Sequence, residues 1–266
     1  MRRRSQQLLT QLQASKLYPP RSNSDLRTLY TRISESSSPP HHKQSLLYYI
    51  LLDLSLPKRS ATAYARHVFL PPKYATLMDG LWRLDRLDFE HALDSLAAPS
   101  LIPTFPEETL LVLARHVKDH DPGLVLAYYH TVAPEIRDQK VLDEVFRCMC
   151  MASVTESFFY ARQQRDAMHK HLFLGLLKHV LSEVKGRAKA QRAAETVGLP
   201  MSADEELWFE EYLLSGGGSR LAGAKDTVIM RRLIRGRLGE VKELSGSMKE
   251  KQLDGMSWTG LTESVA

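Results

Sequence analysis

Residues 44–72 read QSLLYYILLDLSLPKRSATAYARHVFLPP, and this stretch decides the fold class. Its apolar residues recur three and four positions apart, which is the spacing of one face of an α-helix. In the first half these residues are Leu46, Leu47, Ile50, Leu51 and Leu54. Pro57 ends the first segment and Pro71-Pro72 ends the second, because proline cannot continue a helix. The stretch therefore predicts two short helices joined by a turn.

The same pattern continues through most of the chain, where proline or glycine separates apolar segments with helical spacing. The expected segments are 73–86, 88–97, 106–117, 124–132, 140–151, 154–164, 166–195, 202–214 and 224–244. Ser202 and Glu205 have the spacing of a capping box at the start of one of them. No segment alternates apolar and polar residues as a half-buried strand would. The sequence therefore predicts an all-α fold.

Successive helix pairs also resemble one another weakly. Ala92, Ala127 and Phe159 occupy similar places after a turn, at offsets of 35 and 32 residues. Antiparallel helix pairs that repeat at such intervals stack into solenoids, although no tetratricopeptide or ankyrin consensus is complete here. We expect an irregular α-helical solenoid of stacked antiparallel helix pairs over 45–214. A basic, partly disordered arm over 1–44 precedes it, and a glycine hinge, a basic amphipathic helix and a mobile tail follow over 215–266.

The composition is that of an ordinary globular protein. Hydrophobic residues make up 43% and charged residues 25% of 266 residues, which excludes a wholly disordered chain. Two cysteines cannot build a disulfide framework, so a reducing compartment is expected. The most apolar run, Leu46–Leu56, is too short for a transmembrane helix. We therefore expect no transmembrane segment.

Excess positive charge lies near both ends of the chain. The net charge is +5, and residues 1–45 alone carry eight Lys and Arg against two acids. Residues 220–237 carry six Lys and Arg against one acid. Such patches bind phosphate backbones or anionic lipid, but they also occur as solvated tails or as surfaces for acidic proteins. Charge alone therefore leaves nucleic acid as a weak candidate partner beside an acidic protein.

No arrangement of residues in the sequence requires an enzyme. The chain lacks a glycine-rich phosphate loop ending in Lys-Ser/Thr, and no Ser or Cys lies in a nucleophile elbow. His116 and His120 have a spacing that can place two imidazoles on one metal, but Val117 stands where a zinc protease carries Glu. Cys148 and Cys150 diverge by about 200° on a helix. We predict no catalytic residue, no metal site and no cofactor; a helical metalloenzyme using the two histidines is the alternative.

The last helices carry the candidate partner-binding residues. The end of a solenoid must be capped or covered by a partner. Aromatic residues of 202–214 and basic or apolar residues of 224–244 are suited to such a contact. The candidates are Trp208, Phe209, Tyr212, Leu213, Ile229, Arg231, Arg232 and Arg235.

Residues 46–134 resemble the ELYS-like domain family of nuclear pore assembly proteins. The resemblance rests on YYILLDL at 48–54, ARHVFLPP at 65–72 and MDGLWRLDRLDFEHAL at 78–93. Phe105-Pro106 and the helical pair that ends near Pro134 also match. A generic solenoid would not reproduce these motifs in this order, and the resemblance continues more loosely to about Leu244.

The resemblance implies a structural nucleoporin rather than an enzyme. ELYS-like proteins are scaffold subunits that dock on the Y-shaped outer-ring complex of the nuclear pore, whose nucleoporins have helical and β-propeller domains. The resemblance implies a place in the nucleus, at the nuclear envelope and its pores, and support for pore assembly and for transport of mRNA and protein. It also implies a short, fungal-type member without the β-propeller and AT-hook tail of large animal members.

A chromatin- or DNA-binding tether that uses the basic terminal segments is the alternative function. The AT-hook core of the family, Arg-Gly-Arg-Pro, is not matched, because Leu238 follows Arg235-Gly236-Arg237. The alternative therefore depends on charge rather than on a motif.

Overall fold

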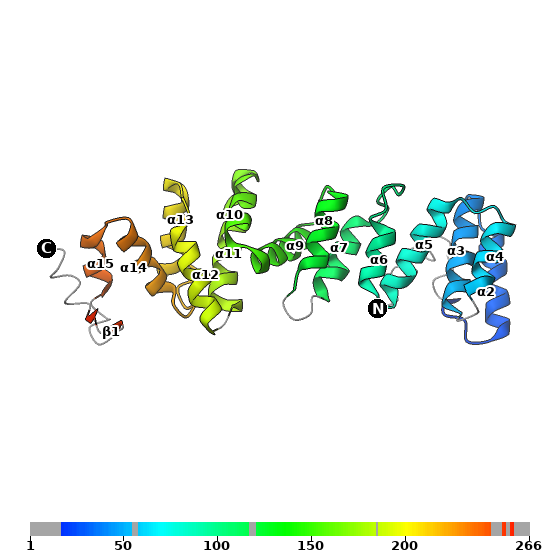
Figure 1. Ribbon diagram of the computed structural model, residues 1–266, viewed down its shortest axis with the longest axis horizontal. Coiled ribbons are helices and arrows are strands. Elements are labelled where there is room, and N and C mark those ends of the chain that lie inside the picture. Colours follow the sequence, from blue (N-terminus) through cyan, green and yellow to red (C-terminus); the bar gives the residue numbers. More distant parts are fainter. Residues whose placement is uncertain are drawn as a thin grey trace. The chain divides into compact units, whose positions relative to one another are not determined.

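The structure is a computed structural model, and it describes residues 17–54, 58–116, 121–184, 186–245, 252–253 and 256–257. Within these ranges the chain is built of α-helices (Figure 1), which confirms the all-α prediction. Two strands of two residues each, β1 (Gln252–Leu253) and β2 (Met256–Ser257), pair antiparallel. The sequence predicts no strand there, because a ladder of two residues is too short to show an alternating pattern.

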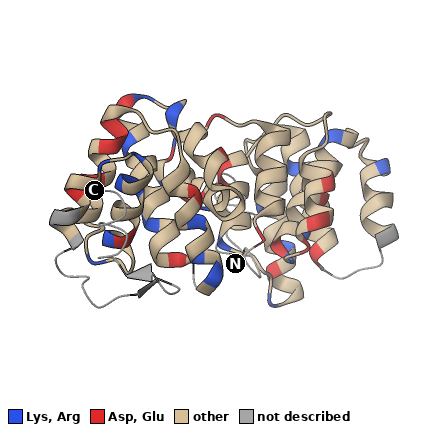
Figure 2. Cartoon of the chain, turned by 60° about the vertical axis from the view of Figure 1, so that its left-hand side comes forward, with Lys and Arg blue, Asp and Glu red and all other residues tan. Residues whose placement is uncertain are grey.

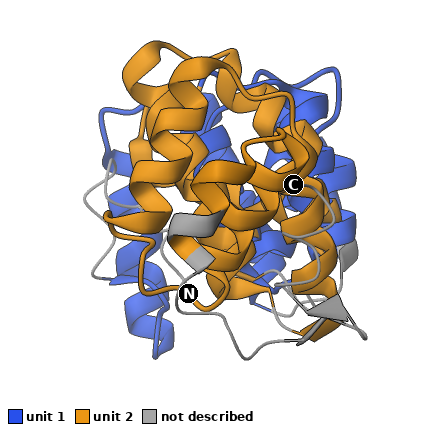
Figure 3. Cartoon of the chain, turned by 90° about the vertical axis from the view of Figure 1, so that its left-hand side faces the viewer, with its two compact units in different colours: residues 1–113, 124–135 blue, residues 114–123, 136–266 orange. Residues whose placement is uncertain are grey.

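The chain divides into two compact units (Figure 3). Unit 1 comprises residues 1–113 and 124–135, and unit 2 comprises residues 114–123 and 136–266. The helices that lie wholly or mostly in unit 1 are α2 (Asn23–Glu35), α3 (Pro40–Asp53), α4 (Lys58–His67), α5 (Pro72–Asp85), α6 (Phe89–Leu96), α7 (Pro106–Arg115) and α8 (Gly123–Val132). Those of unit 2 are α9 (Gln139–Ala152), α10 (Val154–Arg162), α11 (Asp166–Lys178), the π-helical turn η2 (His179–Glu183), α12 (Gly186–Gly198), α13 (Ala203–Leu214), α14 (Ala224–Ile234) and α15 (Leu238–Ser245).

In unit 1, α3 packs against α2, α4 and α5, and α5 packs against α6. Proline occupies the first turn of α3 and of α5, where its missing N–H costs little. The core between these helices buries Leu29, Ile33, Leu46, Met78 and Leu81. Each such side chain contributes about 1.5–3 kcal/mol by leaving water. Within the segment 1–44, which the sequence predicts as an arm, the structure places the packed helix α2; residues 1–16 lie outside the described residues.

Hydrogen bonds between α3 and α5 supplement the apolar core of unit 1. The Tyr48 hydroxyl donates to Asp79 Oδ1 over 3.0 Å, and the Tyr49 hydroxyl donates to Asp85 Oδ2 over 2.6 Å. Burial and then the neighbouring Asp79 carboxylate raise the pKa of Tyr48, so this hydroxyl stays a donor at neutral pH. These contacts fix the relative positions of α3 and α5.

A glycine in α5 allows the close approach of α6. A Cβ added at Gly80 would stand 2.7 Å from the side chain of Leu96, closer than carbon atoms can pack. The absence of a side chain at Gly80 therefore has a packing reason.

In unit 2, α11 packs against α9, α10 and α13, while α12 packs against α10 and α14. Aromatic side chains fill the centre: Phe158, Phe173 and Phe209 are all buried, and the first two rings meet edge to face with centroids 6.1 Å apart. Such pairs add about 0.5–1.5 kcal/mol to the free energy gained by burial. The helices α13 and α14, which the sequence assigns to different domains, pack directly against each other.

Two helices predicted as single segments are broken in the structure. The predicted helix 166–195 divides into α11, η2 and α12, because Val184 is extended and Gly186 takes a positive φ of 63°. The predicted helix 224–244 divides into α14 and α15 at Gly236, whose φ is 71°. Apolar spacing continues across both breaks, so periodicity alone does not reveal them. Among the described helices, none combines the length and the apolar character that a membrane crossing needs.

Candidate partner-binding surface

The candidate surface is built on α13, whose N-terminus is fixed by the predicted capping box. Ser202 Oγ accepts from the Glu205 backbone N–H over 3.3 Å, and Glu205 Oε2 accepts from the Ser202 backbone N–H over 2.6 Å. This reciprocal pair satisfies two N–H groups that the first turn of a helix leaves free. It confirms the capping box and orients the acidic face of α13.

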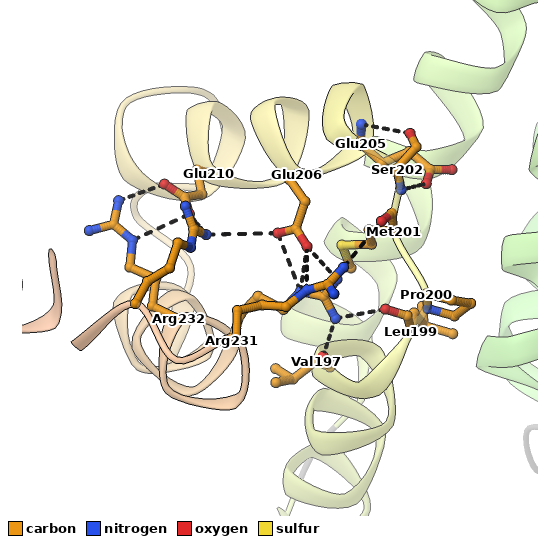
Figure 4. A network of polar contacts seen from close by, with 12 residues as sticks. Val197, Leu199, Pro200, Met201, Ser202, Glu205, Glu206, Glu210, Arg231 and Arg232 are labelled. Atoms are coloured by element: carbon orange, nitrogen blue, oxygen red, sulfur yellow. Dashed lines mark hydrogen bonds and ion pairs between the residues drawn. The ribbon is translucent and has the colours of Figure 1, made fainter. Parts of the chain in front are cut away.

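Arg231 of α14 is buried, with 2% of its surface exposed, and its guanidinium is satisfied inside the chain. Its Nη2 lies 2.5 Å from Glu206 Oε1. Its Nη1 donates to the carbonyl oxygens of Val197 and Leu199 over 2.5 and 2.7 Å. Figure 4 shows the guanidinium reaching from α14 to these acceptors. A buried arginine is tolerated because every contact meets a carboxylate or a carbonyl.

A second buried arginine pairs one turn further along α13. Arg232 Nη2 lies 2.5 Å from Glu210 Oε2 (Figure 4). Its Nη1 donates to the Glu240 carbonyl over 3.0 Å. Arg237 contacts the other oxygen of Glu210. Burial alone would raise the pKa of Glu210, but hydrogen bonds from Arg232 and Arg237 outweigh it and hold that pKa below its usual value. The carboxylate therefore stays charged between the two guanidinium groups.

Arg235 completes what we call the arginine–glutamate layer: Arg231, Arg232, Arg235 and Arg237 against Glu206 and Glu210. The Arg235 Nε donates to Glu206 Oε1 over 3.1 Å, and its side chain keeps 46% of its surface exposed. Acidic and basic residues accordingly lie intermixed on the helices rather than in separate areas (Figure 2). Four of the six basic residues in 220–237 are thus paired within the chain.

Glu205 links α13 to the two helices on its other side. Its side chain has 0% exposure and contacts Arg162 Nη2 at 2.5 Å and His169 Nε2 at 2.9 Å. Burial would raise its pKa, but hydrogen bonds from Arg162, the Ser202 backbone and His169 lower it to about 2. A residue predicted as a helix cap therefore also forms a buried ionic contact between α10, α11 and α13.

Trp208 lies on the partly exposed side of α13. His169 meets its ring edge to face with centroids 5.2 Å apart, and Lys170 Nζ lies 5.6 Å from the ring. More exposed apolar side chains are Leu207, the neighbour of Trp208 in the sequence, and Met230 and Ile234 of α14. Met230 and Ile234 are four residues apart and so share one face of α14. We use the name α13–α14 surface for four exposed or half-buried residues of the two helices: Trp208 and Tyr212 of α13, and Met230 and Ile234 of α14.

Comparison with known proteins identifies the family. A family model described as ELYS, nuclear pore complex assembly, matches residues 3–216. The chain belongs to the ELYS family. Members of this family take part in nuclear pore complex assembly. The match includes α13 with Glu205, Glu206 and Glu210, and it ends before α14.

A curated relative from Schizosaccharomyces pombe is named "Uncharacterized protein ely5". The two chains are 30% identical over 194 residues, which is 72% of this ELYS-family chain and 60% of that relative. This chain therefore aligns with less than two thirds of the relative's length.

The eight predicted partner-binding residues of this ELYS-family chain fall into two groups. The structure buries five of them inside unit 2: Phe209, Leu213, Ile229, Arg231 and Arg232. The prediction that these five side chains lie on the surface is therefore corrected. Apolar spacing is the same for a core face and for an interface, and Arg231 and Arg232 pair with glutamates of α13. Trp208, Tyr212 and Arg235 keep exposed surface, and for them partner binding stays a prediction.

The candidates for chemistry behave as follows. His120 lies outside the described residues, and across those that are described no three His, Cys, Asp or Glu side chains gather as a metal site. Burial raises the pKa of the Cys148 thiol to about 11 and that of Cys150 to about 12. Both thiols are therefore protonated at neutral pH and pack in the core.

The family motifs of the sequence coincide with contacts of unit 1. Tyr48 and Tyr49 of the first motif donate to Asp79 and Asp85 of the third, and Gly80 admits Leu96. The residues that carry the resemblance thus hold α3, α5 and α6 together.

Proposed function

We propose that this ELYS-family chain is a structural nucleoporin that docks on the Y-shaped outer-ring complex of the nuclear pore. In this role it supports pore assembly and the transport of mRNA and protein. The observation that carries the proposal is the family match over residues 3–216, which includes most of the described helices. The partners are the helical and β-propeller nucleoporins of that complex.

The α13–α14 surface is the proposed contact. Ile234 is 61% exposed, and Met230 lies on the same face of α14. Trp208 and Tyr212 add half-buried aromatic rings, which dominate the binding energy of many protein interfaces. Exposed apolar side chains of this kind are suited to a protein partner.

Pairing within the arginine–glutamate layer favours the scaffold role over the DNA-binding alternative. A guanidinium that already contacts a carboxylate releases few counterions on meeting a phosphate, so it adds little to DNA affinity. Arg231 and Arg232 are also buried and unable to reach a duplex. Residues 1–16, which hold much of the remaining positive charge, lie outside the described residues.

A binding measurement on immobilised, reconstituted Y-complex tests the proposed contact. We expect Ile234→Asp to weaken binding about tenfold or more, because it places a charge in an apolar interface. The matched control is Tyr30→Ser, at a side chain of α2 that is also exposed, and it should leave affinity within about twofold. Equal affinities of the two variants would remove the α13–α14 surface from the proposal.

We also propose that the helix pairs stack as an irregular solenoid. A compact domain of 266 residues has a radius of gyration of about 18 Å. Small-angle X-ray scattering of the monomer should give a clearly larger value, and a value near 18 Å would contradict the solenoid.

A further inference from the structure

Unit 1 contains an apolar groove that the contacts within unit 1 leave open. Its volume is about 480 Å³, and it lies among α3, α5 and the segment that precedes α7. The apolar side chains that line it are Leu46, Leu77, Met78, Leu101, Ile102 and Phe105. Ile102 is 84% exposed, which is far more than a side chain that serves the core would be. We call this cavity the α3–α5 groove.

One end of the groove is electropositive. Helices α3 and α5 begin side by side there, since the rings of His41 and Tyr74 stack with centroids 5.6 Å apart. Both helices start at proline and carry no acidic residue in the first turn, so their positive dipole ends are not neutralised locally. Lys73 and His42 also line the groove, and among the described lining residues none is acidic.

Phe69 lies in the turn that leads into Lys73, and its backbone is strained. Its φ is 53°, and 86% of its surface is exposed. The turn is closed by a hydrogen bond from the Leu70 N–H to the Ala65 carbonyl over 2.9 Å. The same turn at the end of α14 uses Gly236, with the Arg237 N–H bonded to the Arg232 carbonyl over 2.9 Å. A bulky aromatic side chain in a position that favours glycine costs backbone strain, as does Leu87 with a φ of 64° in the same kind of turn, and the exposed Phe69 ring is free to contact a ligand.

We infer that the α3–α5 groove and Phe69 bind a protein segment that is both apolar and acidic. Its large apolar side chains fill the groove beside Ile102, and its carboxylates lie at the N-termini of α3 and α5 near Lys73. Charge complementarity identifies this occupant, because a basic or neutral segment would leave the positive end of the groove unpaired. Nucleic acid is disfavoured, since phosphates gain nothing from a lining of Leu, Met, Ile and Phe.

Selection from a displayed library of random 12-residue peptides tests the proposal on the full chain. The enriched peptides should combine at least two carboxylates with two large apolar residues. Synthetic copies of them should lose affinity about tenfold for Ile102→Asp and for Lys73→Glu in fluorescence anisotropy. The matched control is Leu207→Asp in unit 2, at a side chain that is 68% exposed, which should leave their affinity within about twofold.

A second variant separates binding from folding. Phe69→Gly should keep or raise the melting temperature, because glycine suits the positive φ, yet it should weaken the same peptides several-fold. The proposal is overturned if no peptide is enriched, if enriched peptides lack carboxylates, or if the groove variants bind them unchanged. It is also overturned if a 20-nucleotide single-stranded DNA displaces them at equal concentration.

Discussion

Two pairs of helices in this chain are joined by polar contacts of different kinds. Between α3 and α5, neutral tyrosine hydroxyls donate to Asp79 and Asp85 around an apolar core. Between α13 and α14, buried arginines meet the carboxylates of Glu206 and Glu210. Removing a tyrosine hydroxyl leaves an aspartate that retains other contacts. Removing Glu206 or Glu210 instead leaves the positive charge of a buried arginine without its nearest charged partner. The α13–α14 contact should therefore be the more sensitive of the two.

The largest effect is expected from Glu206→Gln. This change keeps the shape of the side chain but leaves the buried Arg231 without its charged partner, which costs about 3–5 kcal/mol of the free energy of unfolding. Urea denaturation measures it. The control is Glu211→Gln, at a side chain that is 68% exposed and makes a loose 3.8 Å contact, with an expected loss below about 0.5 kcal/mol. Similar losses for both would show that the layer is not a buried ionic contact.

The loss of folding stability at acid pH should depend on Glu205. Its pKa is about 2 in the folded chain, against 4.5 for the free side chain, so the unfolded chain binds the proton first as pH falls. The stability from Glu205 is complete above about pH 4.5 and is lost between there and about pH 2, for a total of about 3 kcal/mol.

The variant Glu205→Gln checks this prediction in unfolding titrations across that pH range. It should be less stable than the wild type at neutral pH and should lose less stability on acidification. A variant with the wild-type pH dependence would assign the acid sensitivity to other carboxylates.

A smaller loss is expected from Tyr48→Phe. The change removes the hydrogen bond to Asp79 and little else, at a cost of about 1.5 kcal/mol, because the acceptor is charged. Thermal unfolding measures the loss, with Tyr30→Phe at an exposed ring as the neutral control. A loss above that of Glu206→Gln would reverse the ranking of the two helix contacts.

The smallest effects come from the two matching turns, and they have opposite signs. Phe69→Gly should raise stability by about 0.5–1 kcal/mol, since it relieves a positive φ. Gly236→Ala should lower stability by about 1 kcal/mol for the same reason. Differential scanning calorimetry resolves both changes, and a destabilised Phe69→Gly variant would mean that the aromatic ring stabilises unit 1.

Much of this fold is predictable from the sequence, because local rules determine it. The proline-initiated helices, the Ser202–Glu205 capping box and the lack of long strands among the described residues follow from spacing and from backbone chemistry. The breaks at Gly186 and Gly236 are less predictable, since apolar spacing continues through them.

The candidate surface is harder to predict than the helices. Residues 220–237 look basic in the sequence, yet Arg231 and Arg232 are buried against glutamates more than twenty residues earlier in the chain. Net charge in a window carries no information on such pairing. The acidic residues of 202–214 and the basic residues of 224–237 could have indicated it, since opposite charges on successive helices favour their contact.

Co-elution on size exclusion tests the central claim most directly. The full chain is mixed with reconstituted Y-complex at near-physiological salt, with and without duplex DNA as competitor. We expect a stoichiometric complex that duplex DNA does not dissociate, because the arginines of α14 are already paired with carboxylates within the chain. Absence of a complex, together with salt-sensitive binding to the duplex, would contradict it and favour a chromatin tether.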